Sequence, residues 1–124
     1  MKPAKDKFIV VVGVSHKEDK FGYRIFKSLL DKGFRVEGVN PTDGEVAGRK
    51  IFRSLAEVPG QVDMVITVVN PSVTEQVVEQ CRQLKIPELW MQPGSESEKA
   101  INQAREYGIS VTHDACFMVE QGVW

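Results

Sequence analysis

The run Phe-Ile-Val-Val-Val at residues 8–12 constrains the fold more than any other feature of this 124-residue chain. Every position is apolar, most are β-branched, and Gly13 ends the run. A strand with one face in water alternates apolar and polar residues, so a continuous apolar run predicts a strand buried on both faces. Such strands are typical of parallel sheets that carry helices on both sides.

Further apolar stretches predict four more strands, at residues 34–39, 62–69, 88–91 and 109–112. Between them, apolar residues recur at helical spacing in segments 25–30, 73–84 and 101–107, and Gly33 and Gly108 are the expected helix stops. This alternation predicts an α/β fold: a single Rossmann-like domain over residues 1–124 with a doubly wound, parallel, five-stranded sheet. Right-handed crossovers give 3-2-1-4-5 as the simplest strand order. Segment 41–62 has room for only a short helical turn.

Two serines stand where helices are expected to begin, each with a glutamate three residues later. Ser72 with Glu75 and Ser95 with Glu98 match the capping box, in which two side chains satisfy free amides at a helix start. The spacing predicts helices that begin at these serines.

Composition excludes several classes of protein. With 42% hydrophobic and 27% charged residues, the chain belongs with folded globular domains. A net charge of -1 leaves no surplus for nucleic acid, and the longest apolar run is far shorter than the roughly 20 residues that cross a membrane. The first residues lack the apolar segment of a signal peptide, and two distant cysteines form neither a disulfide framework nor a zinc site. These features predict a cytoplasmic protein without a metal.

In an open parallel sheet, ligands bind beyond the carboxyl ends of the strands, where the strand order reverses. Short polar loops follow the first four predicted strands, and strands two and three both end in Asn-Pro. Proline stiffens such turns and holds the amide side chains at the rim, although Asn-Pro is also simply a good loop former. The candidate binding residues at this edge are Gly13, Val14, Ser15, His16, Lys20, Gly22, Asn40, Pro41, Thr42, Val69, Asn70, Pro71, Met91, Gln92 and Pro93.

The first loop favours a phosphate ligand more than it favours NAD. A dinucleotide fingerprint needs G-x-G-x-x-G, but here Ser15 replaces the second glycine and the next glycine is Gly22. The loop carries His16, Lys17 and Lys20, which could face a phosphate together with amides at the helix start. An alternative is that Ser15, with Glu18, only starts a helical turn.

The end of the second strand also argues against NAD. That cofactor usually meets an acidic residue there, whereas this chain has Asn40-Pro41, with Glu37 inside the strand and Asp43 just beyond the proline. The balance favours a phosphate-bearing nucleotide other than NAD. An NAD(P)- or flavin-binding oxidoreductase subunit that works with a partner chain remains the alternative.

Motifs in a fixed order run along nearly the whole chain, from about Lys7 to Glu120. They are Val-Gly-Val-Ser at 12–15, Lys-Phe-Gly at 20–22, Val-Asn-Pro at 39–41, Glu-Val-Ala-Gly at 45–48, Ser-Leu at 54–55, Val-Asp at 62–63, Trp-Met-Gln-Pro-Gly at 90–94 with Glu98, and His-Asp-Ala-Cys at 113–116 with Glu120. With these motifs the chain resembles the small stand-alone CoA-binding proteins, whose domain is similar to the N-terminal domain of the succinyl-CoA synthetase α subunit.

The resemblance implies coenzyme A or an acyl-CoA as ligand, with its ADP part across the strand ends. Ser15 and His16 would then face the pyrophosphate. The segment 40–42 would border the nucleotide, 69–71 would line its other side, and 91–93 would match a contact of the synthetase relative. The family commonly has a lysine after the Asn-Pro pair, where this chain has Thr42 and Asp43; Arg49, Lys50 and Lys20 are candidates to replace it.

The sequence contains no catalytic set. His113 and Cys116 could in principle be a base and a nucleophile, but two residues three apart are weak support, and single cysteines of this kind are mostly packing residues. Cys81 lies on the apolar side of its predicted helix. We therefore expect a binding module without catalysis of its own, with a possible protein partner that supplies chemistry. A redox switch at Cys116, through a mixed disulfide with CoA, is a third hypothesis.

Overall fold

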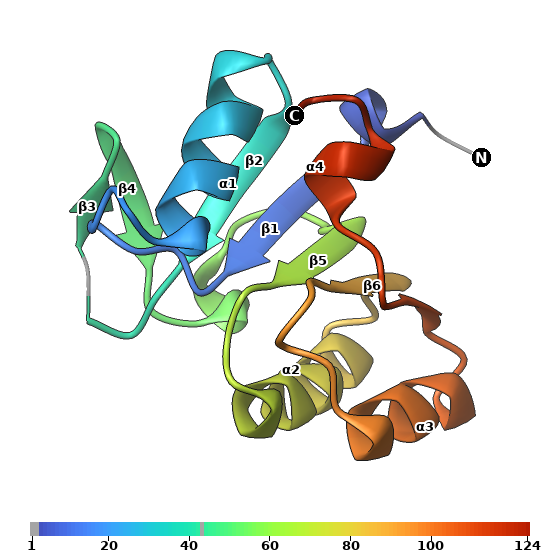
Figure 1. The fold of residues 1–124 in the computed structure, drawn as a ribbon. Coiled ribbons are helices and arrows are strands. Elements are labelled where there is room, and N and C mark those ends of the chain that lie inside the picture. Colours follow the sequence, from blue (N-terminus) through green and yellow to red (C-terminus); the bar gives the residue numbers. More distant parts are fainter. Residues whose placement is uncertain (1–2, 43) are drawn as a thin grey trace.

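The computed structural model describes residues 3–42 and 44–124, and within them seven strands form one sheet. Helices cover both faces of the sheet (Figure 1). The strands are β1 (Phe8–Val12), β2 (Arg35–Val39), β3 (Glu45–Val46), β4 (Arg49–Phe52), β5 (Met64–Thr67), β6 (Glu88–Met91) and β7 (Ser110–Thr112). The helices are α1 (Phe21–Asp31), α2 (Pro71–Gln83), α3 (Glu98–Glu106) and α4 (Phe117–Glu120), with 3-10 turns at Ala4–Asp6 and Leu55–Glu57.

The predicted strand order is wrong, and so is the predicted count of five strands, because the sheet has seven. The sheet runs β3-β4-β2-β1-β5-β6-β7, so the predicted third strand, β5, pairs directly with β1 instead of lying beyond β2. The position beyond β2 belongs to β4, which is parallel to β2 and lies in the segment where only a short helical turn was expected. Sequence reasoning missed β4 because this short strand begins with the exposed Arg49 and Lys50 and has no continuous apolar run.

The strand order nevertheless reverses beside β1. From β1 the chain passes to β2 and β4 on one side of the sheet, then crosses to β5, β6 and β7 on the other. The small β3 is antiparallel to β4 and extends this edge of the sheet. A ligand crevice is therefore expected at the carboxyl ends of β1 and β5.

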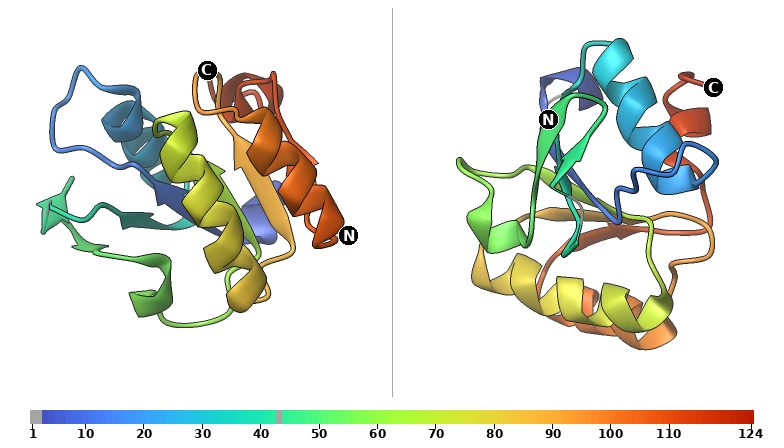
Figure 2. Two further views of the ribbon diagram at one scale, coloured as in Figure 1. Left: turned by 90° about the horizontal axis from the view of Figure 1, so that it is seen from below. Right: turned by 90° about the vertical axis from the view of Figure 1, so that its left-hand side faces the viewer.

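The core has two layers, one on each face of the sheet. All five residues of β1 are buried, as the continuous apolar run predicts. Val10 and Val12 pack in the layer beneath α2 and α3, while Ile9 and Val11 pack in the layer beneath α1 and α4. Figure 2 shows α2 and α3 side by side over their face of the sheet.

The two predicted N-caps, Ser72 and Ser95, are each wrong by two residues, because the N-caps are Asn70 and Ser97. Helix α2 begins at Pro71 after Asn70, and no side chain caps it. Helix α3 is capped by Ser97, whose Oγ accepts a hydrogen bond from the Ala100 amide at 3.1 Å. Ser97 Oγ also donates to Glu75 Oε2 at 2.6 Å, so the glutamate expected to cap α2 instead links the two helices.

Ser95, the other predicted cap, is buried beneath the site edge. Its Oγ lies 2.7 Å from the Gln92 carbonyl oxygen and 3.0 Å from the Thr67 carbonyl oxygen. This serine therefore connects the loop after β6 to the end of β5.

Among the described residues, 3–42 and 44–124, no helix has both the length and the apolar character needed to cross a membrane.

Candidate functional site

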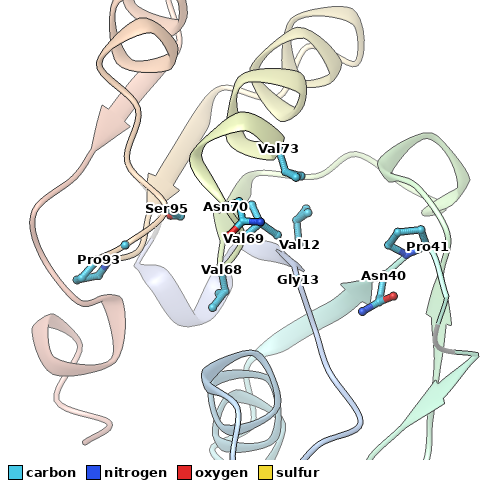
Figure 3. Close-up of a pocket in the computed structure, with 11 residues that line it drawn as sticks. Val12, Gly13, Asn40, Pro41, Val68, Val69, Asn70, Val73, Pro93 and Ser95 are labelled. Carbon is cyan, nitrogen blue, oxygen red and sulfur yellow. The ribbon is translucent and has the colours of Figure 1, made fainter.

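Three adjoining pockets open along the carboxyl edge of the sheet. The largest, which we name the central slot, has a volume of about 500 Å³ and is shown in Figure 3. The second, the loop pocket, measures about 460 Å³ and lies between the β1–α1 loop and Thr42. The third, the end pocket, measures about 170 Å³ and lies between α1 and Cys116. Val68, directly after β5, lines all three pockets, and we call these adjoining pockets together the groove.

The central slot crosses the sheet from β2 to β6. Asn40 and Pro41 lie at one end and Pro93 at the other, with Val12 and the segment 68–70 between them (Figure 3). Val73 from the first turn of α2 forms a further part of its wall. Since neighbouring strands lie about 4.8 Å apart, the three spacings from β2 to β6 give the slot a length of about 14 Å. Such a slot can hold an elongated ligand.

The loop pocket offers positive charge and a helix N-terminus. The exposed side chains of His16, Lys17 and Lys20 surround it, and α1 begins there with no side-chain cap. Amides at an uncapped helix start bind anions, and phosphate is the usual one. Ser15 Oγ accepts a hydrogen bond from the Lys17 amide at 3.0 Å, so this hydroxyl shapes a turn ahead of the helix.

Two glycines bring the loop against the sheet and the helix. A Cβ at Gly13, where φ is +106°, would collide with the Val68 carbonyl group. A Cβ at Gly22 would collide with the Gly13 carbonyl oxygen. The backbone of the β1–α1 loop is therefore in direct contact with the backbone at the end of β5 and in the first turn of α1; we call this arrangement the backbone stacking. Gly22 supplies the close helix packing that the last glycine of a dinucleotide fingerprint supplies.

The Asn40 side chain fixes the second loop to the first. Its Nδ2 donates to the Val14 carbonyl oxygen at 2.5 Å, and its Oδ1 accepts from the Thr42 amide and hydroxyl at 2.8 and 2.9 Å. The amide that the sequence placed at the rim is thus a brace between two loops. Asn40 and Thr42 border the pockets in a set geometry rather than as mobile side chains.

The end pocket has a wall built around Gln92. This side chain is buried; its Oε1 accepts from the Phe117 amide at 2.7 Å, and its Nε2 points to Cys116 Sγ at 3.4 Å. Trp90 Nε1 donates to the Ala115 carbonyl oxygen at 2.8 Å and holds the turn that precedes α4. The strand end and α4 are therefore locked together behind the pocket.

Most predicted site residues meet in this groove, but three do not line it. Val14 and Met91 are fully buried in the core, and Pro71 is the first residue of α2. The residues that line the pockets are Gly13, Ser15, His16, Lys20, Gly22, Asn40, Pro41, Thr42, Val69, Asn70, Gln92 and Pro93. Asp43, on which the NAD alternative depends, lies outside the described residues.

Sequence reasoning missed several lining residues. Phe21 and Val73 come from the first turns of α1 and α2, and Ile25 lies one helical turn after Phe21. A helix that starts at a strand end turns its first residues toward the same edge, so their position could have been inferred. Cys116, far along the chain, carries no such signal.

The two residues considered as a catalytic pair, His113 and Cys116, have different partners. His113 Nδ1 pairs with Asp114 Oδ2 at 2.5 Å, whereas Cys116 Sγ has Gln92 as its partner. Cys81 is fully buried, as predicted, and burial raises its pKa to about 12. Within residues 3–42 and 44–124, no three or more His, Cys, Asp or Glu side chains are grouped to hold a metal ion.

A family model described as the CoA binding domain matches residues 7–122. The chain belongs to this family. The resemblance predicted from the sequence is therefore confirmed, and it covers the whole groove. The match includes all four strand-end loops that line the central slot and the start of α4 behind the end pocket.

Relatives of this CoA binding domain include both small proteins and parts of larger ones. The uncharacterized protein YneT of Bacillus subtilis is 32% identical, over 96% of this chain and 88% of YneT. A conserved hypothetical protein of Pyrococcus furiosus has a similar structure, with a TM-score of 0.88 and 39% identity over 92% of this chain and 98% of that one. The α subunit of the ADP-forming acetate–CoA ligase I of P. furiosus is 31% identical over 85% of this chain, which spans about a quarter (26%) of the subunit.

Proposed function

We propose that this protein binds coenzyme A or an acyl-CoA in the groove and catalyses no reaction by itself. The observation that carries the proposal is the central slot at the reversal of strand order, joined to an uncapped helix N-terminus beside three cationic or ionisable side chains. Membership of the CoA binding domain family supports this ligand over other nucleotides.

The groove offers a place for each part of the ligand. The diphosphate would lie in the loop pocket, near Ser15, His16 and Lys20, where the helix amides and the positive charges offset its own charge. The adenosine would lie at the Asn40–Thr42 end, with Val69 and Asn70 on its other side. The long arm that ends in the thiol would follow the slot past β5 toward Gln92 and Pro93.

Chemistry, if the bound CoA undergoes any, would come from a partner. Cys116 and His113, the candidate nucleophile and base, are each bonded to another residue. The acetate–CoA ligase α subunit contains a related domain in about a quarter of its length, so most of that subunit has no counterpart in this chain. We therefore propose a carrier, sensor or subunit role, and a partner chain that supplies catalysis.

Calorimetric titration with CoA, acetyl-CoA and NAD tests the proposal. We expect CoA to bind with a Kd below 1 mM, a limit that corresponds to only about 4 kcal/mol. Lys20→Ala should weaken CoA binding by about three- to tenfold, because a charge beside the diphosphate is lost, and added salt should reduce this difference.

Lys32→Ala is the matched control, because Lys32 is an exposed lysine at the opposite end of α1. It should leave the affinity unchanged. If no CoA species binds below 1 mM, the proposal is wrong. If NAD binds more tightly than CoA, the oxidoreductase alternative replaces it.

A further inference from the structure

We infer that the end pocket holds the acyl group of a short-chain acyl-CoA and limits its length. The inference rests on the proposed function, because it requires CoA in the groove. Its basis is the position, lining and size of the end pocket.

The position of the end pocket suits the thiol end of CoA. In CoA, the nucleotide and the thiol lie at opposite ends of the molecule. With the nucleotide between Asn40 and the loop pocket, the arm that follows the central slot reaches Pro93, about 14 Å away. Pro93 and Val68 line both the slot and the end pocket, so the end pocket adjoins the slot at the end that the thiol reaches.

The lining of the end pocket suits an apolar group. Four apolar residues, Phe21, Ile25, Val68 and Pro93, line it, and Ile25 is fully buried. Its polar side chain, Gln92, already uses both ends of its amide within the protein. An added polar group would find few partners here, whereas an alkyl chain gains free energy from burial.

The size of the pocket sets a limit on the chain. A protein cavity of about 150 Å³ holds a ligand of benzene size, so about 170 Å³ suits roughly six non-hydrogen atoms. That number corresponds to acyl groups of about two to five carbons. A longer chain exceeds this volume and extends into water, where it gains little from contacts; Phe21, which lines the pocket, is itself 58% exposed.

The first experiment is a titration series with CoA, acetyl-CoA, butyryl-CoA and dodecanoyl-CoA. Each buried methylene should strengthen binding by about fourfold, so butyryl-CoA should bind about tenfold or more tighter than acetyl-CoA. Dodecanoyl-CoA should bind no more than a few times tighter than butyryl-CoA. Equal affinities for CoA and butyryl-CoA, or a steady rise to dodecanoyl-CoA, would overturn the inference.

The second experiment fills the pocket with Cys116→Phe. Of the three pockets, Cys116 lines only the end pocket. The variant should therefore reduce the ratio of the butyryl-CoA affinity to the CoA affinity to about one. Val73→Phe, which narrows the central slot on the other face of the sheet, is the matched control. It should weaken both ligands equally and leave the ratio as in the unsubstituted protein.

The outcomes separate the two proposals. If CoA binds but the unsubstituted protein binds butyryl-CoA and CoA with equal affinity, the acyl site is wrong and the CoA-binding function stands. If no CoA species binds, the proposed function itself fails, and the acyl site fails with it. Circular dichroism verifies that each variant is folded. If a variant does not fold, the titration series on the unsubstituted protein still tests the acyl site.

Discussion

Replacing Gly22 with alanine tests the backbone stacking that shapes the loop pocket. Gly22 is the second residue of α1 and its φ is not in the left-handed region, so the backbone itself accepts alanine. In an unobstructed helix, alanine stabilises by up to about 1 kcal/mol relative to glycine. Here, however, the added Cβ collides with the Gly13 carbonyl oxygen, which is backbone and cannot rotate away.

The expected effect is the difference between these two contributions. Overpacking a tight contact costs about 1–3 kcal/mol, and a collision with backbone atoms falls in the upper part of that range, at about 2–3 kcal/mol. After a gain in helix propensity of about 1 kcal/mol, Gly22→Ala should lower the free energy of unfolding by about 1–2 kcal/mol. With an m-value of about 1.5 kcal/mol/M, the urea midpoint should fall by about 1 M. CoA binding should weaken as well, because relief of the collision moves the loop that lines the pocket.

Gly44→Ala is the control, measured in the same urea titration. Gly44 is exposed, and beyond its chain neighbours no atom lies within 4 Å of an added Cβ. This variant should be neutral or stabilised by up to about 1 kcal/mol. A Gly22→Ala protein as stable as Gly44→Ala would refute the backbone stacking.

Two further predictions concern stability. Burial raises the pKa of Cys81 from 9.0 to about 12, so above pH 9 its thiol ionises in the unfolded state but not in the folded state. The free energy of unfolding should then fall by up to about 1.4 kcal/mol per pH unit between pH 9 and pH 12. Urea midpoints measured at pH 7, 9 and 10 should show this fall, and Cys81→Val should remove the part of the fall that Cys81 causes. A slope unchanged by Cys81→Val would contradict this. Ser97→Ala should lower the free energy of unfolding by about 1–2 kcal/mol in the same assay, because it removes the α3 cap and the hydrogen bond to Glu75. The control, Ser72→Ala, removes no cap and should change the free energy of unfolding by less than about 0.5 kcal/mol. Equal losses in the two variants would contradict the assignment of Ser97 as the α3 cap.

The central elements were predictable because their patterns are local. The buried run at β1, the helical spacing along α1 and the prolines after β2 and β5 each act through the nearest residues, whatever the rest of the chain does. Ser97 shows the limit of this reasoning. Ser72 and Ser95 have the same three-residue spacing to a glutamate, but the packing of α2 against α3 determines which serine caps a helix.

The strand order illustrates a second limit. β4 is short and begins with exposed charged residues, so it has no local signal and forms because β2 offers it an open edge. It lies beyond β2 while β5 pairs with β1, and this arrangement determines which strand ends meet. No inspection of either strand alone could have placed the reversal of strand order correctly.

For the site, the sequence by itself determined the strand-end loops and their polar residues, since each loop directly follows a strand and shares its edge. The tertiary structure decided what those residues do: Asn40 braces two loops, Gln92 is a buried wall, and Met91 belongs to the core. It also brought Cys116 beside Phe21 to form the end pocket. The physical reason is that periodicity and turn chemistry act between neighbours, whereas pockets arise from close packing between segments far apart in the chain.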